Sequence, residues 1–143
     1  MPGGTDSVSQ SPRVALERVL VVEDDASIRA VLSDILACEG YLVDQAANGR
    51  EALLKLQRAR PDVILLDLMM PIVDGPTFVK TCWSLDHAAG IPIVLMSASP
   101  NLAQLAEQLR SYGVRGALTK PFDLNELLTM IEQVSKTSTY SVG

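Results

Sequence analysis

The stretch VILLDLMMPIVDG, residues Val63–Gly75, opens with an uninterrupted apolar run and then places an acidic residue, Asp67, directly after it. Two other short runs, VLVV at Val19–Val22 and IVLM at Ile93–Met96, are also apolar at every position. Strands without alternation of polar and apolar residues are typical of a parallel sheet that helices cover on both faces. The three runs therefore predict the central strands of such a sheet.

Helical patterns lie between these runs. In the first and the last helical segments, apolar residues recur at the i, i+3, i+4, i+7 spacing of one helix face. The residues are Ile28, Val31, Leu32, Ile35 and Leu36, and then Leu124, Leu127, Leu128, Ile131 and Val134. The predicted strands are Arg18–Val22, Tyr41–Ala46, Val63–Leu66, Pro92–Met96 and Gly116–Thr119. This alternation indicates an α/β fold, a doubly wound five-stranded parallel sheet with helices on both faces.

Several residues carry helix-end signals. Asn48 and Asp123 are each followed three positions later by a glutamate, which predicts helix N-termini. Ser99 before Pro100 predicts a third start, with proline at the first helical position. Helix ends are expected before three glycines, where a left-handed backbone is favoured: Gly40, Gly90 and Gly113.

Length and composition limit the class of protein. The chain has 143 residues, enough for one domain, with 48% hydrophobic and 20% charged residues. We expect a body at residues 18–136 between tails at 1–17 and 137–143. The net charge of −5 argues against a broad nucleic-acid or anionic-membrane surface. Without a membrane-spanning apolar run or a secretory pattern at Met1–Gln10, the expected location is the cytoplasm.

Polar residues follow the ends of four predicted strands. Because ligands bind beyond the carboxyl ends of parallel strands, we expect these side chains to share one edge of the sheet. They are Glu23, Asp24 and Asp25, then Asp67, Ser97 and Lys120. Any one of these signals alone is weak, since an acidic pair such as Asp24 and Asp25 is common at a solvated helix start. Their coincidence at one edge favours a site.

The expected site is strongly anionic. Two carboxylates about 4 Å apart repel by ~4 kcal/mol at an effective dielectric constant near 20, so a proton or a cation must join them. Hard oxygen ligands without histidine or cysteine favour Mg²⁺, which commonly works on phosphates. A nearby lysine adds positive charge for phosphoryl oxygens, and one carboxylate can then act as a nucleophile that forms an aspartyl phosphate.

These segments resemble the receiver domain of bacterial two-component response regulators. The resemblance rests on VLVVEDDASIR (Val19–Arg29), VILLDLMMPIVDG (Val63–Gly75), VLMSAS (Val94–Ser99) and LTKPF (Leu118–Phe122), and it spans about Arg18 to Lys136. It implies a flavodoxin-like sheet in the strand order 2-1-3-4-5. It also implies a phosphoprotein of a two-component or phosphorelay system, a signalling domain and not an enzyme that acts on external substrates.

The resemblance also assigns roles to individual residues. Asp67 matches the phosphoacceptor, Ser97 the hydroxyl residue that turns toward the phosphoryl group, and Lys120 the lysine that pairs with it. For Mg²⁺, Asp24 matches a direct ligand and Glu23 one that acts through water. Asp67 and the backbone carbonyl of Met69 complete the metal site. The peptide bond between Lys120 and Pro121 is expected to be cis, and the side chains of Met69 and Ser99 are expected to flank the path of the hydrolytic water.

The implied partners are a sensor histidine kinase or a histidine phosphotransfer protein as phosphodonor, and a downstream effector or a missing output domain. Family members often carry Tyr or Phe three residues before the lysine, where this chain has Ala117. The charge-paired dimer of the transcription-factor branch is not supported by Gly113–Gly116 (GVRG), although a weak homodimer remains compatible with the sequence.

Three alternatives to a phosphoaccepting receiver remain open at this point. The first is a pseudo-receiver that is not phosphorylated and acts as an interaction scaffold. A metal-dependent phosphohydrolase is disfavoured because Met69 stands where such enzymes place a general acid. A flavin or nucleotide binder is disfavoured because EDDA, and no glycine-rich turn, follows the first strand.

Overall fold

The computed structural model describes residues 17–70 and 72–140, with side chains through residue 135. The predicted N-terminal tail, except Glu17, lies outside the described residues, as do residues 141–143 of the predicted C-terminal tail. The last helix extends to Tyr140, beyond the predicted body boundary at Lys136. No helix in the described part of the chain has the length and apolar character needed to cross a membrane.

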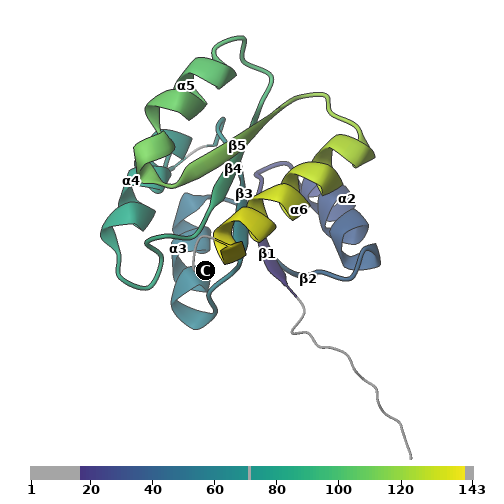
Figure 1. Ribbon diagram of the computed structural model, residues 1–143, viewed down its shortest axis with the longest axis horizontal. Helices are drawn as coiled ribbons and strands as arrows, with labels where there is room; N and C mark the ends of the chain where they lie inside the picture. Colours follow the sequence, from purple (N-terminus) through teal and green to yellow (C-terminus); the bar gives the residue numbers. More distant parts are fainter. Residues whose placement is uncertain (1–16, 71, 141–143) are drawn as a thin grey trace, which may run out of the picture.

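Five strands alternate with helices along the chain. The elements are β1 (Arg18–Val22), α2 (Ala26–Cys38), β2 (Leu42–Ala46), α3 (Gly49–Arg58), β3 (Val63–Asp67), α4 (Gly75–Ser84), β4 (Ile93–Ser97), α5 (Leu102–Gln108), the 3₁₀ turn η1 (Arg110–Tyr112), β5 (Val114–Thr119) and α6 (Leu124–Tyr140). All strand pairs are parallel, in the order β2-β1-β3-β4-β5 (Figure 1). The predicted fold class and strand order are confirmed.

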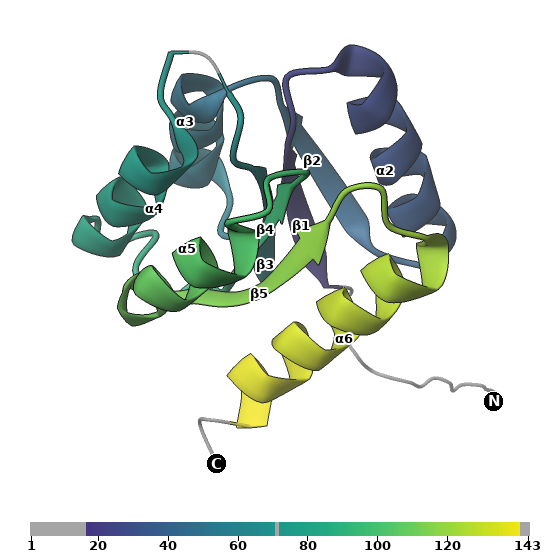
Figure 2. The ribbon, with the colours of Figure 1, turned by 90° about the horizontal axis from the view of Figure 1, so that it is seen from above.

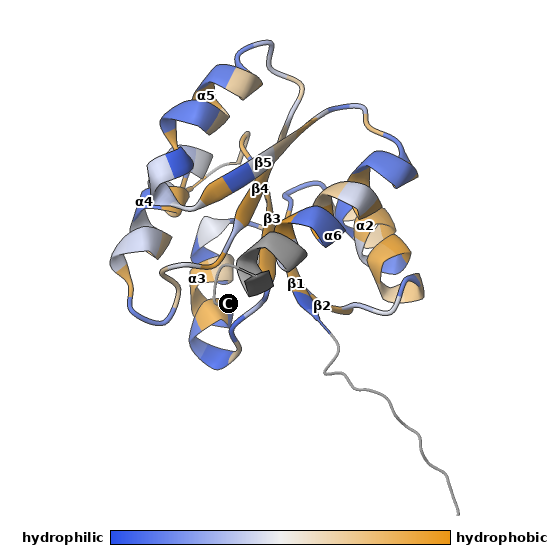
Figure 3. Cartoon of the chain, in the orientation of Figure 1, coloured by the Kyte–Doolittle hydropathy of each residue, from blue (hydrophilic) through white to orange (hydrophobic). Residues whose placement is uncertain are grey.

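The helices form two layers around the sheet. Figure 2 shows α2 and α6 on one face and α3, α4 and α5 on the other. Because side chains alternate along a strand, Val19 and Val21 pack toward the α2–α6 layer. Leu20 and Val22 pack into the opposite cluster. This two-sided burial explains why the central strands are apolar at every position, and Figure 3 shows the hydrophilic residues mainly on the outer surfaces of the helices.

Most predicted helix ends are confirmed. The Asn48 side chain accepts a hydrogen bond from the Glu51 N–H, and the Asp123 side chain accepts one from the Glu126 N–H, so both residues are N-caps. Gly40, Gly90 and Gly113 all have left-handed φ angles between 87° and 100°. Gly40 follows α2 and Gly113 follows the 3₁₀ turn η1, as predicted. The helix end predicted before Gly90 is wrong, because α4 already ends at Ser84 and a turn leads to the glycine.

The predicted helix start at Ser99 and Pro100 is wrong. Helix α5 begins at Leu102, and Pro100 and Asn101 form a turn. The Ser99 hydroxyl oxygen accepts a hydrogen bond from the Asn101 N–H at 3.2 Å. A local side chain to backbone bond of this kind competes with helical geometry, and it delays the helix.

Strand boundaries differ slightly from the prediction. β3 ends with Asp67 and β4 ends with Ser97, because strand pairing depends on backbone groups and continues through a polar residue. β5 begins at Val114, two positions before the predicted start, and an irregularity in its pairing with β4 lies between Ile93 and Val94.

Candidate functional site

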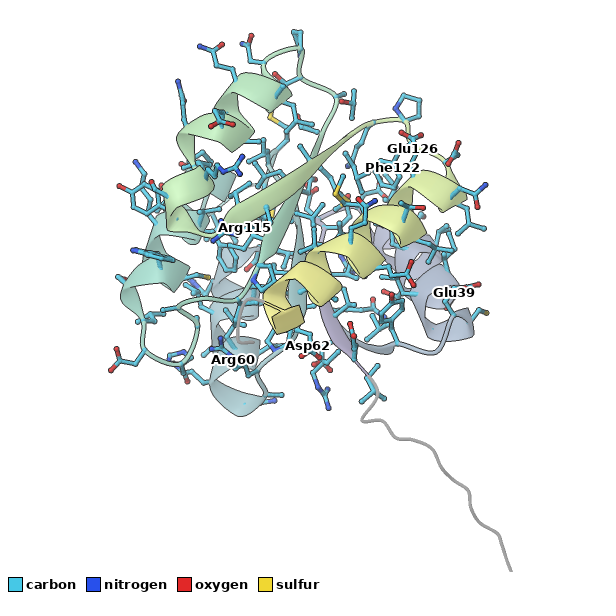
Figure 4. All side chains as sticks on the ribbon, viewed as in Figure 1. Glu39, Arg60, Asp62, Arg115, Phe122 and Glu126 are labelled. Atoms are coloured by element: carbon cyan, nitrogen blue, oxygen red, sulfur yellow. The ribbon has the colours of Figure 1, made fainter. Side chains whose placement is uncertain are left out.

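The carboxyl ends of β1, β3, β4 and β5 meet at one edge of the sheet. Asp67 is in register with Met96 of β4, and Ser97 is in register with Thr119 of β5. Glu23 directly follows β1, where its N–H donates to the Ala46 carbonyl at 3.1 Å. In Figure 4, Phe122, which follows Lys120 by two residues in the chain, and Glu126 lie at one end of the molecule, whereas Arg60 and Asp62 lie at the other end.

Glu23 is a buried carboxylate with two neighbours. The residue is only 1% exposed, and its Oε1 lies 2.9 Å from the Lys120 Nζ. Its other oxygen, Oε2, accepts a hydrogen bond from the Asp25 N–H at 3.3 Å. The Glu23 carbonyl accepts a hydrogen bond from the Arg29 guanidinium at 2.7 Å, which fixes the backbone at the start of the loop after β1. Lys120 therefore compensates the Glu23 charge in this state.

Asp67 is also buried, at 4% exposure. Its Oδ1 accepts a hydrogen bond from the Met69 N–H at 3.1 Å, and its Oδ2 lies 3.8 Å from the Lys120 Nζ. Burial, together with the hydrogen bond and the charge of Glu23, raises the pKa of Asp67 to about 7, although the Met69 N–H and Lys120 act in the opposite direction. The site thus holds a carboxylate at an energetic cost near neutral pH.

Three carboxylates form a compact group. Glu23, Asp24 and Asp67 each offer an oxygen, and these oxygens lie within 4.8 Å of one another. Glu23 and Asp67 are buried, whereas Asp24 is exposed, so the group opens toward water on one side. Such a set of oxygen donors suits a hard cation, because a cation would offset the repulsion that raises the pKa of Asp67.

The hydroxyl and lysine positions are joined through the backbone. Ser97 is 1% exposed, and its hydroxyl oxygen accepts a hydrogen bond from the Ser99 N–H at 3.0 Å. The Lys120 N–H donates to the Ser97 carbonyl at 2.9 Å, so the ends of β4 and β5 are directly connected. The Lys120–Pro121 peptide bond is cis, as the resemblance implies.

All the predicted site residues lie at this edge of the sheet. Glu23, Asp67 and Lys120 are in direct contact or close to it, and Asp24 completes the acidic group. Met69 contributes its backbone, while its side chain points outward and is 72% exposed.

Two local contacts support the site. Asp25 caps α2, since its side chain accepts a hydrogen bond from the Ile28 N–H at 3.0 Å. This role agrees with the helix start that the sequence indicates at Asp24 and Asp25, although the cap itself was not predicted. Sequence reasoning missed the hydrogen bond from Arg29 to the Glu23 carbonyl, because no motif in the sequence marks that contact.

Comparisons with known proteins agree with this geometry. A family model described as "Response regulator receiver domain" matches residues 19–132. Sporulation initiation phosphotransferase F of Bacillus subtilis is 33% identical over 117 residues, covering 82% of this chain and 92% of that protein. Chemotaxis protein CheY of Thermotoga maritima is 34% identical over 121 residues, covering 84% of this chain and 98% of that protein.

The structure of chemotaxis response regulator CheY4 of Vibrio cholerae has a TM-score of 0.76 and 37% identity, with 84% of this chain and 99% of that chain covered. Other curated relatives are longer: the match spans 25% of the Escherichia coli regulatory protein AtoC and about half of several transcriptional regulators. The matches cover more than 90% of the two small regulators and of the CheY4 chain, and the family model covers residues 19–132 of this chain. The chain belongs to the response regulator receiver domain family.

Proposed function

We propose that this chain is a phosphoacceptor of a two-component or phosphorelay system, with Asp67 as the residue that receives the phosphoryl group. The observation that carries the proposal is the position of the Asp67 carboxylate, which is buried close to the carboxylates of Glu23 and Asp24 and to the Lys120 ammonium. An isolated buried carboxylate would be unfavourable, and here it lies where a cation and a lysine can both neutralise incoming phosphoryl oxygens. We further propose that residues 18–136 form the receiver body.

In the proposed reaction, an Asp67 carboxylate oxygen attacks the phosphorus of a phosphohistidine. A phosphorus–oxygen bond forms to Asp67, the phosphorus–nitrogen bond breaks, and the imidazole leaves with the electron pair of that bond and takes up a proton. The Met69 N–H holds Oδ1 and so fixes the carboxylate for in-line attack. Glu23, Asp24, Asp67 and the Met69 carbonyl would hold Mg²⁺, which when bound supplies charge neutralisation for the transfer.

Lys120 and Ser97 are proposed to respond to the new phosphoryl group. Lys120 pairs with Glu23 at 2.9 Å and lies farther, at 3.8 Å, from Asp67. A dianionic group on Asp67 would draw the ammonium away from Glu23, because charge-assisted bonds to phosphoryl oxygens are strong. The Ser97 hydroxyl would donate to another phosphoryl oxygen. Since the Lys120 N–H is bonded to the Ser97 carbonyl, both changes act on the joined ends of β4 and β5.

We propose that the phosphodonor, a sensor histidine kinase or a histidine phosphotransfer protein, docks beside α2. A largely apolar cavity of about 420 Å³ lies there, lined by residues of α2 such as Ile28 and Val31 and by the segment from Lys120 to Leu124. Lys120, which lines this cavity, has its Nζ 3.8 Å from the Oδ2 of Asp67, the proposed phosphoacceptor. The signal would then pass to a separate effector or to an output domain. Because such donors are phosphorylated at the expense of ATP, we propose the cytoplasm as the location.

Phosphorylation by a small donor tests the proposal without the cognate kinase. The parent chain, Asp67→Asn and the matched control Asp25→Asn are incubated with acetyl phosphate, with Mg²⁺ or with a chelator, and intact masses are measured. We expect one phosphoryl group on the parent and on Asp25→Asn only when Mg²⁺ is present, and none on Asp67→Asn. A folded parent chain that binds no Mg²⁺ and takes up no phosphoryl group would instead support the pseudo-receiver alternative.

A further inference from the structure

Helix α3 has an exposed outer side that carries a line of three residues. The helix packs against β1, β2 and α4, with Ala52 and Leu56 buried. Arg50, Leu54 and Arg58 follow one another at intervals of four residues, so they lie along the side opposite these buried residues. All three are exposed, and Leu54 at the centre is 54% exposed. We call this line of three residues the outer face of α3.

The surroundings of this face are basic although the chain has a net charge of −5. Residues 50–60 contain a single acidic residue, Glu51, and four basic residues, which are Arg50, Lys55, Arg58 and Arg60. The Glu51 carboxylate is bound at the start of the helix, where its Oε1 accepts a hydrogen bond from the Ala47 N–H at 2.7 Å. Among the described residues, no carboxylate forms an ion pair with Arg50 or Arg58. Both guanidinium groups are therefore available to a partner.

Helix stability explains only part of this positive charge. A cation near the carboxyl end of a helix is favourable because it offsets the helix dipole, and Lys55 and Arg58 lie in the last turn of α3. Arg50 is the second residue of the helix, where a positive charge opposes the dipole. Leu54 is more than half exposed, so it adds little to the core. An arginine and a leucine that contribute little to the fold favour a binding role for this face.

We propose that the outer face of α3 binds an acidic amphipathic helix of a partner protein. Eight residues of helix rise about 12 Å, so a second helix with the same spacing brings carboxylates to both Arg50 and Arg58. An apolar side chain midway between these carboxylates packs on Leu54 and excludes water from it. Arginine–carboxylate pairs add geometric specificity to this apolar contact. The proposal goes beyond phosphoacceptance and does not rest on it, because none of these residues belongs to the phosphoacceptor site.

Other occupants fit this face less well. A second copy of this chain is disfavoured, because no helix in the described part of the chain carries two acidic residues eight positions apart. An anionic membrane is disfavoured because the apolar side of α3 is already buried against the sheet, which leaves Leu54 as the exposed large apolar residue of the helix. Nucleic acid is disfavoured because α3 contains no aromatic residue on which a base could stack.

Binding of a designed helical peptide tests the proposal. The probe is a capped alanine-based peptide of about 20 residues that presents glutamate, leucine and glutamate at four-residue intervals on one face. Binding is followed at low salt by fluorescence anisotropy and by amide NMR shifts, which we expect to be largest in residues 50–58. The double variant Arg50→Gln/Arg58→Gln should bind about tenfold more weakly and Leu54→Gln about fivefold more weakly. The matched control Arg115→Gln, at an exposed position of β5, should bind as the parent does.

Three controls separate this binding mode from the alternatives. A peptide of the same composition with its two glutamates on opposite faces should bind more weakly. Asp67→Asn should bind the peptide as the parent does, so the result is independent of phosphoacceptance. Vesicles of phosphatidylglycerol and phosphatidylcholine should not bind the parent chain.

Four results would overturn the proposal. They are equal binding of the two peptides, unchanged binding by the double variant shown to be folded by circular dichroism, absence of peptide binding to the folded parent, and vesicle binding that requires Arg50 and Arg58.

Discussion

The substitution Asp67→Asn should stabilise the metal-free chain at neutral and alkaline pH. Asp67 is 4% exposed and adjoins Glu23, so its ionised form is poorly solvated and repelled. These effects raise its pKa to about 7, against an ordinary value of 3.8. An asparagine has nearly the same shape, carries no charge and keeps an oxygen that can accept the Met69 N–H.

The sign and size of the effect follow from the pKa shift. A raised pKa means that the folded chain binds the proton more tightly than the unfolded chain. Ionisation of Asp67 therefore lowers the free energy of unfolding, and this loss is absent below about pH 4 and complete above about pH 7. At 1.36 kcal/mol per pKa unit, the shift to about 7 corresponds to a ceiling of about 4 kcal/mol. Because Asp67 interacts with both Glu23 and Lys120, its removal also changes the energies of these two residues. We therefore expect the free energy of unfolding to rise by about 1–3 kcal/mol at pH 8.

Urea denaturation followed by circular dichroism measures this gain in chelator between about pH 5 and pH 8. The stability difference between Asp67→Asn and the parent should grow with pH, and Mg²⁺ should reduce it by stabilising the parent more than the variant. The exposed Asp86 supplies a matched control, since Asp86→Asn should change stability little at any pH. A variant no more stable than the parent at pH 8, or a difference independent of pH, would refute the reasoning.

Three further substitutions test separate parts of the structure. Val31→Asp places a charge in the apolar cavity beside Lys120, and it should slow phosphotransfer from a histidine-bearing partner at least tenfold while labelling by acetyl phosphate is unchanged. Lys120→Met removes a cation that lowers the pKa of Asp67, so this pKa should rise further above about 7 in a carboxyl NMR titration of the metal-free chain. Asn48→Ala removes the N-cap of α3 and should lower the free energy of unfolding by about 1 kcal/mol in urea.

The sequence predicts the sheet well because its strands are buried on both faces. Short continuous apolar runs such as Val63–Leu66 are typical of strands in the middle of a parallel sheet, and each is followed by a helical pattern. The site was predictable for a related reason: parallel strands end at one edge, so Asp67 and Ser97 had to lie near each other once the strands were assigned. The motifs that carry the family resemblance determined the remaining positions.

The parts that were not predictable depend on contacts between distant residues. Nothing near Lys120 in the sequence reveals that its ammonium lies closer to Glu23 than to Asp67. At Ser99, the side chain had two local options, a helix cap or a turn with the Asn101 N–H, and the turn was formed. The sequence shows an alanine, and no aromatic residue, at position 117. The cavity of about 250 Å³ that Ala117 lines forms only when α5 packs against β5.

The central claim is that Asp67 itself receives the phosphoryl group, and mapping the modified residue tests it most directly. Borohydride reduces an acyl phosphate to an alcohol but leaves a free carboxylate or a phosphoserine unchanged. After incubation with Mg²⁺ and acetyl phosphate, reduction and tandem mass spectrometry should find homoserine at position 67 and at no other acidic residue. Reduction at Asp24 or Asp25, or a stable phosphoryl group on Ser97, would contradict the claim.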